Sequence, residues 1–167
     1  MAARRTRKLI DAGATAPDFR LPQLDAGDLT LKEVAANRPA LLVFFKVSCP
    51  ICQMTFPFLE RLHGGGKLPV FGISQNDDED TREFNRRFGV TFPTLLDSED
   101  SGFPASNDYG ISSVPTLFLV EPRGGEPGVA VSHVIEGWNK KEMAWLGDKA
   151  GVNLFRPGDK VPDWKAG

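Results

Sequence analysis

The sequence lacks the features that mark a nucleic-acid-binding or a membrane-spanning protein. Its 20 lysines and arginines are nearly balanced by 22 aspartates and glutamates, so the formal net charge is only −2. A nucleic-acid-binding face would require a local excess of basic residues. Nowhere does the chain contain the roughly 18 consecutive apolar residues that a membrane-spanning helix needs. We therefore expect no nucleic acid among its partners and no membrane span.

The N-terminal residues are not expected to form a Sec-type signal or a membrane anchor. Arg4, Arg5, Arg7 and Lys8 are followed by no apolar stretch of the kind that a secretory signal contains. This basic cluster is interpreted as a solvated tail, with contact to an anionic surface as the alternative. We therefore predict a cytoplasmic protein, in which a disulfide would be transient more often than structural.

Cysteine is scarce, and both cysteines lie in one short motif. Cys49 and Cys52 are separated by Pro50 and Ile51 within the stretch FFKVSCPICQMTFP. With 167 residues, of which 41% are apolar, the chain is long enough to bury a hydrophobic core without disulfide cross-links. The cysteine pair therefore requires an explanation other than stabilisation of a small fold.

Apolar runs alternate with helical patterns along the chain. Strands are expected at 39–45, 69–74, 93–97, 115–121 and 129–137, and helices at 50–63, 76–89 and 139–151. This order predicts parallel strands first and an antiparallel meander after them, with helices on both faces. The expected fold class is α/β, with three layers around a central mixed sheet. We expect a single domain over 1–167, with tails at about 1–12 and 152–167, the second of them irregular.

Three kinds of site could explain the cysteine pair. A structural zinc site needs four ligands, which Cys49 and Cys52 could form with His63 and His133, although the two histidines lie far apart in the sequence. A structural disulfide across two residues would close too small a loop to constrain the unfolded chain strongly. A redox pair requires a cysteine at a helix N-terminus, where free N–H groups and the helix dipole favour the thiolate.

The residues around Cys49 favour the redox pair. A buried strand is expected to end at Phe45, and only a short turn separates it from the helix that starts beside Pro50. Proline is tolerated at the first helical position because its missing N–H would have no intrahelical partner there. Cys49 would then be the exposed nucleophile. Cys52, one turn further along the helix, would be more buried and would resolve the mixed disulfide.

The motifs resemble the thioredoxin superfamily, in its redoxin branch. This branch contains the TlpA/ResA-like thiol-disulfide oxidoreductases and the related AhpC/TSA peroxiredoxins. The resemblance runs from about Gly13 to Gly151 and rests on five features: the segment GATAPDFRL as an N-terminal extension, the CPIC motif, Pro57 in the helix after it, the Val-Pro-Thr sequence at 114–116, and the glycine before the final helix. The unit between Gly66 and Asp97 resembles the strand–helix insertion of redoxins.

The resemblance implies a thiol-disulfide oxidoreductase whose only redox group is the disulfide of the cysteine pair, without a bound cofactor or a metal. It also implies a cis Val114–Pro115 peptide bond beside the pair, which would leave the Val114 backbone free to pair with an extended substrate segment. Pro50 and Gly137 would lie at the same substrate-binding surface. A proline that simply opens a strand is the alternative for Pro115. The implied partners are a protein or small-molecule disulfide and a thioredoxin-type electron donor.

The sequence also departs from the resemblance near the cysteines. The acid that thioredoxin buries behind its pair is replaced by Val43, and the usual tryptophan by Ser48. Ile51 cannot donate a hydrogen bond to the Cys49 sulfur. These departures indicate a less stabilised thiolate. We therefore expect a less oxidising, reductase-like reduction potential for the cysteine pair. Lys46 could supply positive charge to the thiolate, or it could be an ordinary solvated lysine at a strand end.

Peroxide reduction is the main alternative function. A peroxiredoxin of this branch has a threonine three residues before the reactive cysteine and a proline four residues before that. Here Lys46 and Leu42 take those positions, so the threonine hydroxyl that would align a peroxide for attack by Cys49 is missing. An antioxidant peroxidase is therefore expected less than disulfide exchange. A non-catalytic, redox-sensing module of thioredoxin fold is the third candidate.

Overall fold

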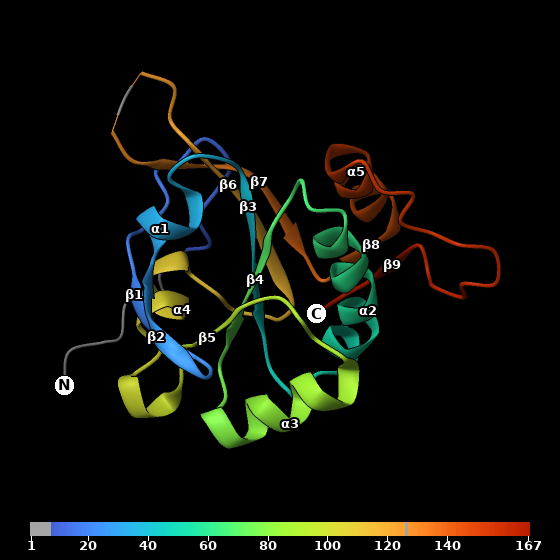
Figure 1. Ribbon diagram of the computed structural model, residues 1–167, viewed down its shortest axis with the longest axis horizontal. Coiled ribbons are helices and arrows are strands. Elements are labelled where there is room, and N and C mark those ends of the chain that lie inside the picture. Colours follow the sequence, from blue (N-terminus) through green and yellow to red (C-terminus); the bar gives the residue numbers. More distant parts are fainter. Residues whose placement is uncertain (1–7, 126) are drawn as a thin grey trace.

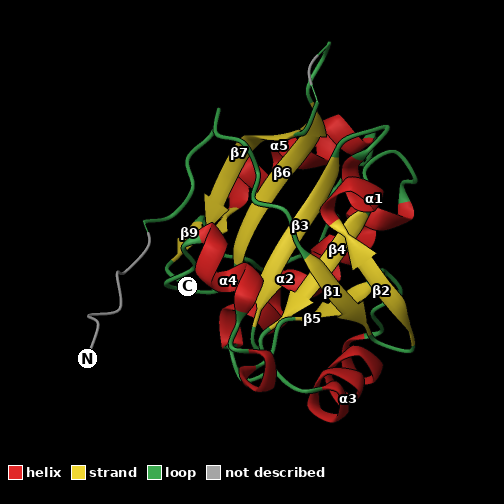
Figure 2. Cartoon of the chain, turned by 90° about the vertical axis from the view of Figure 1, so that its left-hand side faces the viewer, coloured by secondary structure: helices red, strands yellow, loops and turns green. Residues whose placement is uncertain are grey.

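The computed structural model describes residues 8–125 and 127–167, which form a mixed sheet with helices on both faces (Figures 1 and 2). From one edge to the other, the seven strands are β2 (Ala26–Thr30), β1 (Arg20–Gln23), β5 (Thr94–Leu96), β4 (Val70–Ser74), β3 (Ala40–Phe45), β6 (Thr116–Pro122) and β7 (Val129–Glu136). Helices α2 (Pro50–Gly64), α3 (Asp78–Phe88) and α5 (Lys140–Ala150) lie on one face, and α1 (Leu31–Ala35) and α4 (Pro104–Tyr109) lie on the other. The predicted three-layer α/β class is confirmed.

The strand directions follow the predicted order. Strand β3 runs parallel to β4, and β4 runs parallel to β5, whereas β6 is antiparallel to both β3 and β7. The β1–β2 hairpin and the short helices α1 and α4 were not predicted. Strand β1 has a single buried residue, Leu21, so the sequence there carries little hydrophobic periodicity.

The central strand β3 joins the two halves of the core. All six of its residues are buried, and successive side chains point to opposite faces of the sheet. The ring of Phe45 packs against Phe56 of α2, with 4.5 Å between ring centroids, and against Phe84 of α3. The ring of Phe44 instead packs against Tyr109 of α4 at 5.3 Å. This double-sided packing fixes the end of β3 from which the cysteine motif emerges.

The predicted helix starts are confirmed by their capping contacts. The Asp77 carboxylate accepts the backbone N–H of Asp80 at the start of α3. The Asn139 side chain likewise accepts the N–H of Glu142 at the start of α5, at 3.1 Å. Side-chain acceptors at these positions satisfy N–H groups that have no partner within the helix. Within the described residues, no helix is both long enough and apolar enough to cross a membrane.

The segment after α5 packs back onto the domain, although most of it has no regular structure. Its end forms β9 (Trp164–Lys165), which pairs antiparallel with β8 (Trp138–Asn139). Figure 1 shows this segment leaving α5 and returning beside α2. At the other end of the chain, Lys8 lies 3.8 Å from the Asp11 carboxylate, and the rest of the predicted basic cluster lies outside the described residues.

Candidate active site

The cysteine pair lies where β3 leads into α2. Cys49 is the N-cap of α2 with extended backbone angles, and its sulfur accepts the backbone N–H of Cys52 at 3.1 Å. Pro50 takes the first helical position, as the sequence predicted. Cys49 is half-buried, whereas Cys52 is fully buried, and both are free thiols. The expectation that Cys52 is the deeper of the two cysteines is confirmed.

The turn before Cys49 is held by side chains that belong to no recognisable motif in the sequence. The N–H of Cys49 donates to the Lys46 carbonyl at 3.2 Å, which closes the turn. The Asn76 side chain accepts the N–H of Val47 at 3.0 Å, and the Gln53 amide donates to the Val47 carbonyl at 2.9 Å. Asn76 follows β4, the parallel neighbour of β3. The carboxyl ends of parallel strands share one edge of a sheet, and this relation could have identified Asn76.

The surroundings of the two sulfurs differ. Burial raises the pKa of the Cys52 thiol far above its usual value, and its contact with Cys49 raises this pKa further. Cys52 is therefore a protonated thiol at neutral pH. Cys49 is only partly buried, and a backbone N–H is directed at its sulfur. The arrangement thus separates an outer sulfur suited to attack from an inner one that can react only after the outer one has done so.

The loop before β6 brings the predicted substrate-binding residues to the pair. The Val114–Pro115 peptide bond is cis, as expected from the resemblance. The Cys49 thiol donates to the Val114 carbonyl at 3.5 Å, and the N–H of Gly137 donates to the Pro115 carbonyl at 2.8 Å. Pro50 is exposed next to Cys49. Val114 therefore contacts the outer sulfur directly, and Gly137 is connected to it through Pro115; Val114, Pro115 and Gly137 are themselves buried.

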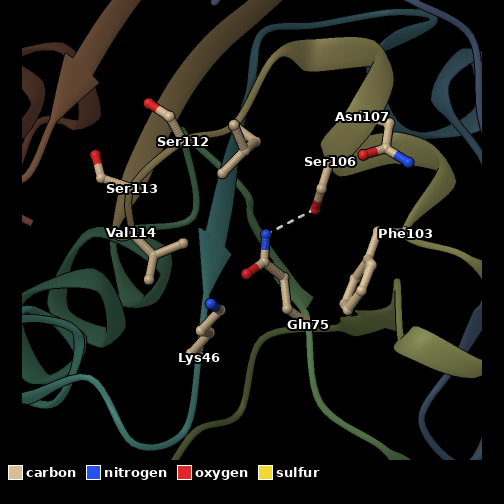
Figure 3. Close-up of a pocket in the computed structure, with 9 residues that line it drawn as sticks. Lys46, Gln75, Phe103, Ser106, Asn107, Ser112, Ser113 and Val114 are labelled. Carbon is tan, nitrogen blue, oxygen red and sulfur yellow. Dashed lines mark hydrogen bonds between the residues drawn. The ribbon is translucent and has the colours of Figure 1, made fainter. Parts of the chain in front are cut away.

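A cavity of about 220 Å³ lies on the far side of this loop. Its walls are formed by Lys46, Gln75, Phe103, Ser106, Asn107, Ile111, Ser112, Ser113 and Val114. Figure 3 shows the Lys46 side chain extending toward the space between Val114 and Gln75. The cavity adjoins the cysteine site because it shares Val114, and it offers hydroxyl, amide and ammonium groups to a polar ligand.

One wall of the cavity is fixed by a buried carboxylate. Asp97 is fully buried and accepts the backbone N–H groups of Ala105 and Ser106 at 2.9 and 2.7 Å. The Ser106 hydroxyl also donates to Asp97 at 2.6 Å and accepts the Gln75 amide at 2.9 Å. Since each group in this chain has a partner, the start of α4 holds the wall in place.

The two histidines make local contacts. The Nδ1 atom of His63 accepts the N–H of Val70 at 3.1 Å, and the Nε2 atom of His133 lies 3.0 Å from the Glu142 carboxylate. Across residues 8–125 and 127–167, no group of three or more histidine, cysteine, aspartate or glutamate side chains is arranged to hold a metal ion. The zinc interpretation therefore has no four-ligand site in this part of the chain.

Comparison with known proteins agrees with this geometry. The sequence model of the AhpC/TSA family matches residues 12–125. The chain belongs to the AhpC/TSA family. Thiol-disulfide oxidoreductase ResA of Halalkalibacterium halodurans is 30% identical over 122 residues, which cover 71% of this chain and 67% of the relative. The ResA protein of Bacillus subtilis is 25% identical and covers 92% of this chain and 80% of its own length.

The fold is shared with solved structures of lower sequence identity. A thiol:disulfide interchange protein from Bacteroides sp. superposes with a TM-score of 0.69 at 17% identity, covering 87% of this chain and 93% of its own. At this identity the likeness concerns the fold alone. Together with the family match, it confirms the thioredoxin-like redoxin architecture that the sequence resembles.

Proposed function

We propose that this protein is a thiol-disulfide oxidoreductase that exchanges disulfides through Cys49 and Cys52. The observation that carries the proposal is the pairing of a partly buried N-cap cysteine with a fully buried, protonated one a single turn away. The AhpC/TSA family match and the ResA relatives, which are named for thiol-disulfide oxidoreductase activity, support the same reaction. The substrate class is a disulfide, of a protein or of a small molecule.

In the reductive direction, the Cys49 thiolate attacks one sulfur of the substrate disulfide. A mixed disulfide forms, and the departing substrate thiolate takes up a proton. Cys52 then loses its proton and attacks the Cys49 sulfur, which releases the second substrate thiol. The substrate gains two electrons and two protons, and the protein is left with a Cys49–Cys52 disulfide. An external dithiol donor of thioredoxin type is proposed to reduce it again.

The raised pKa of Cys52 gives the reaction its order. A buried thiol that holds its proton does not compete with Cys49 for the incoming disulfide. Once Cys49 is in the mixed disulfide, Cys52 is the nearest thiol to its sulfur. No further redox group is needed for this exchange, so the proposed cofactor is the cysteine pair itself. The cytoplasmic location and the identity of the donor stay predictions.

Peroxide reduction is disfavoured by the residues before the pair. Leu42 is fully buried inside β3, and Lys46 is exposed at the end of that strand. Neither residue offers a hydroxyl group to a peroxide at Cys49. The backbone at Val114 lies directly beside Cys49, where main-chain groups could pair with an extended polypeptide.

The test is a comparison of Cys49→Ser and Cys52→Ser proteins with insulin and with hydrogen peroxide as substrates. Both variants are expected to lose insulin reduction, and Cys52→Ser should accumulate a mixed disulfide. A peroxidase that uses Cys49 alone would retain its first oxidation step in Cys52→Ser. Rapid peroxide consumption by the unsubstituted protein, without insulin reduction, would contradict the proposal.

A further inference from the structure

The end of the chain lies across the surface beside the cysteine pair. Gly137 has a left-handed backbone (φ +69°), and a Cβ atom there would lie 2.4 Å from the Lys165 carbonyl oxygen and 2.8 Å from the Gly167 nitrogen. A Cβ atom on Gly167 would lie 2.5 Å from the Val114 carbonyl oxygen. Because Gly137 and Gly167 have no Cβ atom, the backbone of residues 165–167 can lie close to Gly137 and to the Val114 carbonyl.

The backbone groups that this segment covers are those that surround the outer sulfur. The Val114 carbonyl is also the acceptor of the Cys49 thiol at 3.5 Å. Gly137 is tied to the neighbouring Pro115 by its N–H, which donates to the Pro115 carbonyl at 2.8 Å. An extended polypeptide that binds next to Cys49 would need the same main-chain surface.

The segment is firmly held only before it reaches this surface. Arg61 donates to the Asp159 carboxylate through both terminal nitrogens, at 2.7 and 3.2 Å, and to the Leu154 carbonyl at 2.9 Å. The indole N–H of Trp138 donates to the Pro162 carbonyl at 2.7 Å. These contacts form an anchor that ends at residue 162, and just beyond it the Asp163 carbonyl accepts the N–H of Lys140 at 2.9 Å.

Beyond the anchor, the contacts are made by the backbone. Residues 163–167 are all exposed, and Trp164 is 62% exposed. The pairing of β9 with β8 consists of two residue pairs, Trp138 with Lys165 and Asn139 with Trp164. A short exposed strand that buries no side chain has low local stability. Residues 164–167 can thus leave the surface while the anchor stays in place.

We propose that residues 164–167 are an internal competitor that occupies the binding surface of an extended polypeptide substrate. This inference rests on the proposed disulfide exchange and narrows the substrate class to polypeptide disulfides that bind as an added strand along β8 and the Val114 loop. Two chains cannot pair with the same main-chain groups, so substrate must displace the segment. The apparent affinity for the polypeptide is then the affinity of the free surface multiplied by the fraction of molecules in which the surface is free.

The test uses Gly167→Val, which places side-chain atoms against the Val114 carbonyl, with Ala166→Val as the matched control at an exposed position. For Gly167→Val, kcat/KM with insulin should rise roughly three- to tenfold, the gain expected when the surface is freed from a mostly occupied state. The rate with 5,5′-dithiobis(2-nitrobenzoate), which is too short to reach β8, should change by less than about twofold, since this small disulfide does not need to pair with the main chain of β8. Equal kcat/KM values with insulin in both variants would overturn the inference.

A second measurement follows the segment itself. The Cys52→Ser protein is joined at Cys49 to an eight-residue peptide whose cysteine carries a 2-thiopyridyl group, so that Cys49 displaces 2-thiopyridone and forms the mixed disulfide. Hydrogen exchange at β9 should become faster in this conjugate than in the same protein joined to 2-mercaptoethanol. Unchanged exchange would overturn the inference. The hydrogen-exchange measurement does not depend on turnover. A negative result here can therefore be told apart from a negative result for the proposed disulfide exchange, which is tested by the Cys49→Ser and Cys52→Ser variants in the insulin assay.

Discussion

The turn that presents Cys49 and the segment that crosses the neighbouring surface are built in different ways. The turn follows a strand whose six residues are all buried, and the side chains of Asn76 and Gln53 bind its backbone. Residues 164–167 are exposed and rest on the domain by main-chain contacts. The reactive sulfur is therefore held in a fixed position, whereas residues 164–167 can leave the adjacent surface and be replaced by a substrate.

The largest expected effect comes from removing the packing beneath the turn. Phe45→Ala should lower the free energy of unfolding by about 3–5 kcal/mol, the usual cost of deleting a buried phenylalanine ring. The rings of Phe56 and Phe84, which pack on Phe45, would lose this contact. Urea denaturation measures the change.

Trp164→Ala, in the segment 164–167, is the matched control for Phe45→Ala. Its ring is mostly exposed, so the free energy of unfolding should change by less than about 0.5 kcal/mol. A loss as large as that of Phe45→Ala would show that the segment is part of the folded core, and the contrast between the two regions would disappear.

The second prediction concerns the position of Cys49. Asn76→Ala leaves the Val47 N–H without its side-chain acceptor, and a misplaced turn should lower kcat for insulin reduction roughly tenfold or more. Since Asn76 acts through the turn, KM should change little. Asn76→Asp retains an acceptor oxygen and should restore most of kcat. An Asp variant as slow as the Ala variant would contradict the positioning role.

The sequence predicted the turn better than the segment for a physical reason. The buried strand, the proline at the helix start and the capping residues are local signals, and they placed Cys49 and Cys52 correctly on α2. Local signals do not identify the role of Asn76, because this role depends on β4 lying beside β3. From the sequence alone, Asn76 belongs to the start of the next helix.

The segment after α5 shows where local signals fail. Its sequence, rich in proline, glycine and charged residues, predicts no regular structure, and most of it has none. Its position is set by contacts across the chain, such as Arg61 with Asp159 and Trp138 with Pro162. The close approach of Gly137 to this segment likewise carried no signal in the sequence beyond the resemblance to redoxins.

The third prediction tests the anchor. The Arg61 guanidinium, together with the backbone N–H of Arg156, lowers the pKa of the Asp159 carboxyl to about 2. The stabilisation from these contacts is fully present above the unfolded-state pKa of about 3.9 and is lost as the pH falls through about 2. Arg61→Met keeps the apolar stem but removes the charge, so exchange at β9 should be several-fold faster from pH 4 to 7. Hydrogen exchange that matches the unsubstituted protein over this range would contradict the anchoring role.

The smallest expected effect concerns Lys46, which is exposed and faces the cavity beside Val114. If the ammonium group attracts an anionic substrate, Lys46→Met should slow reaction with 5,5′-dithiobis(2-nitrobenzoate) about two- to fivefold, because an exposed charge contributes only about 0–1 kcal/mol. The neutral disulfide 2-hydroxyethyl disulfide should react at an unchanged rate. Raising the salt concentration should remove the difference, since it screens exposed charges. An equal loss with both disulfides, insensitive to salt, would instead place Lys46 among the groups that shape the turn before Cys49.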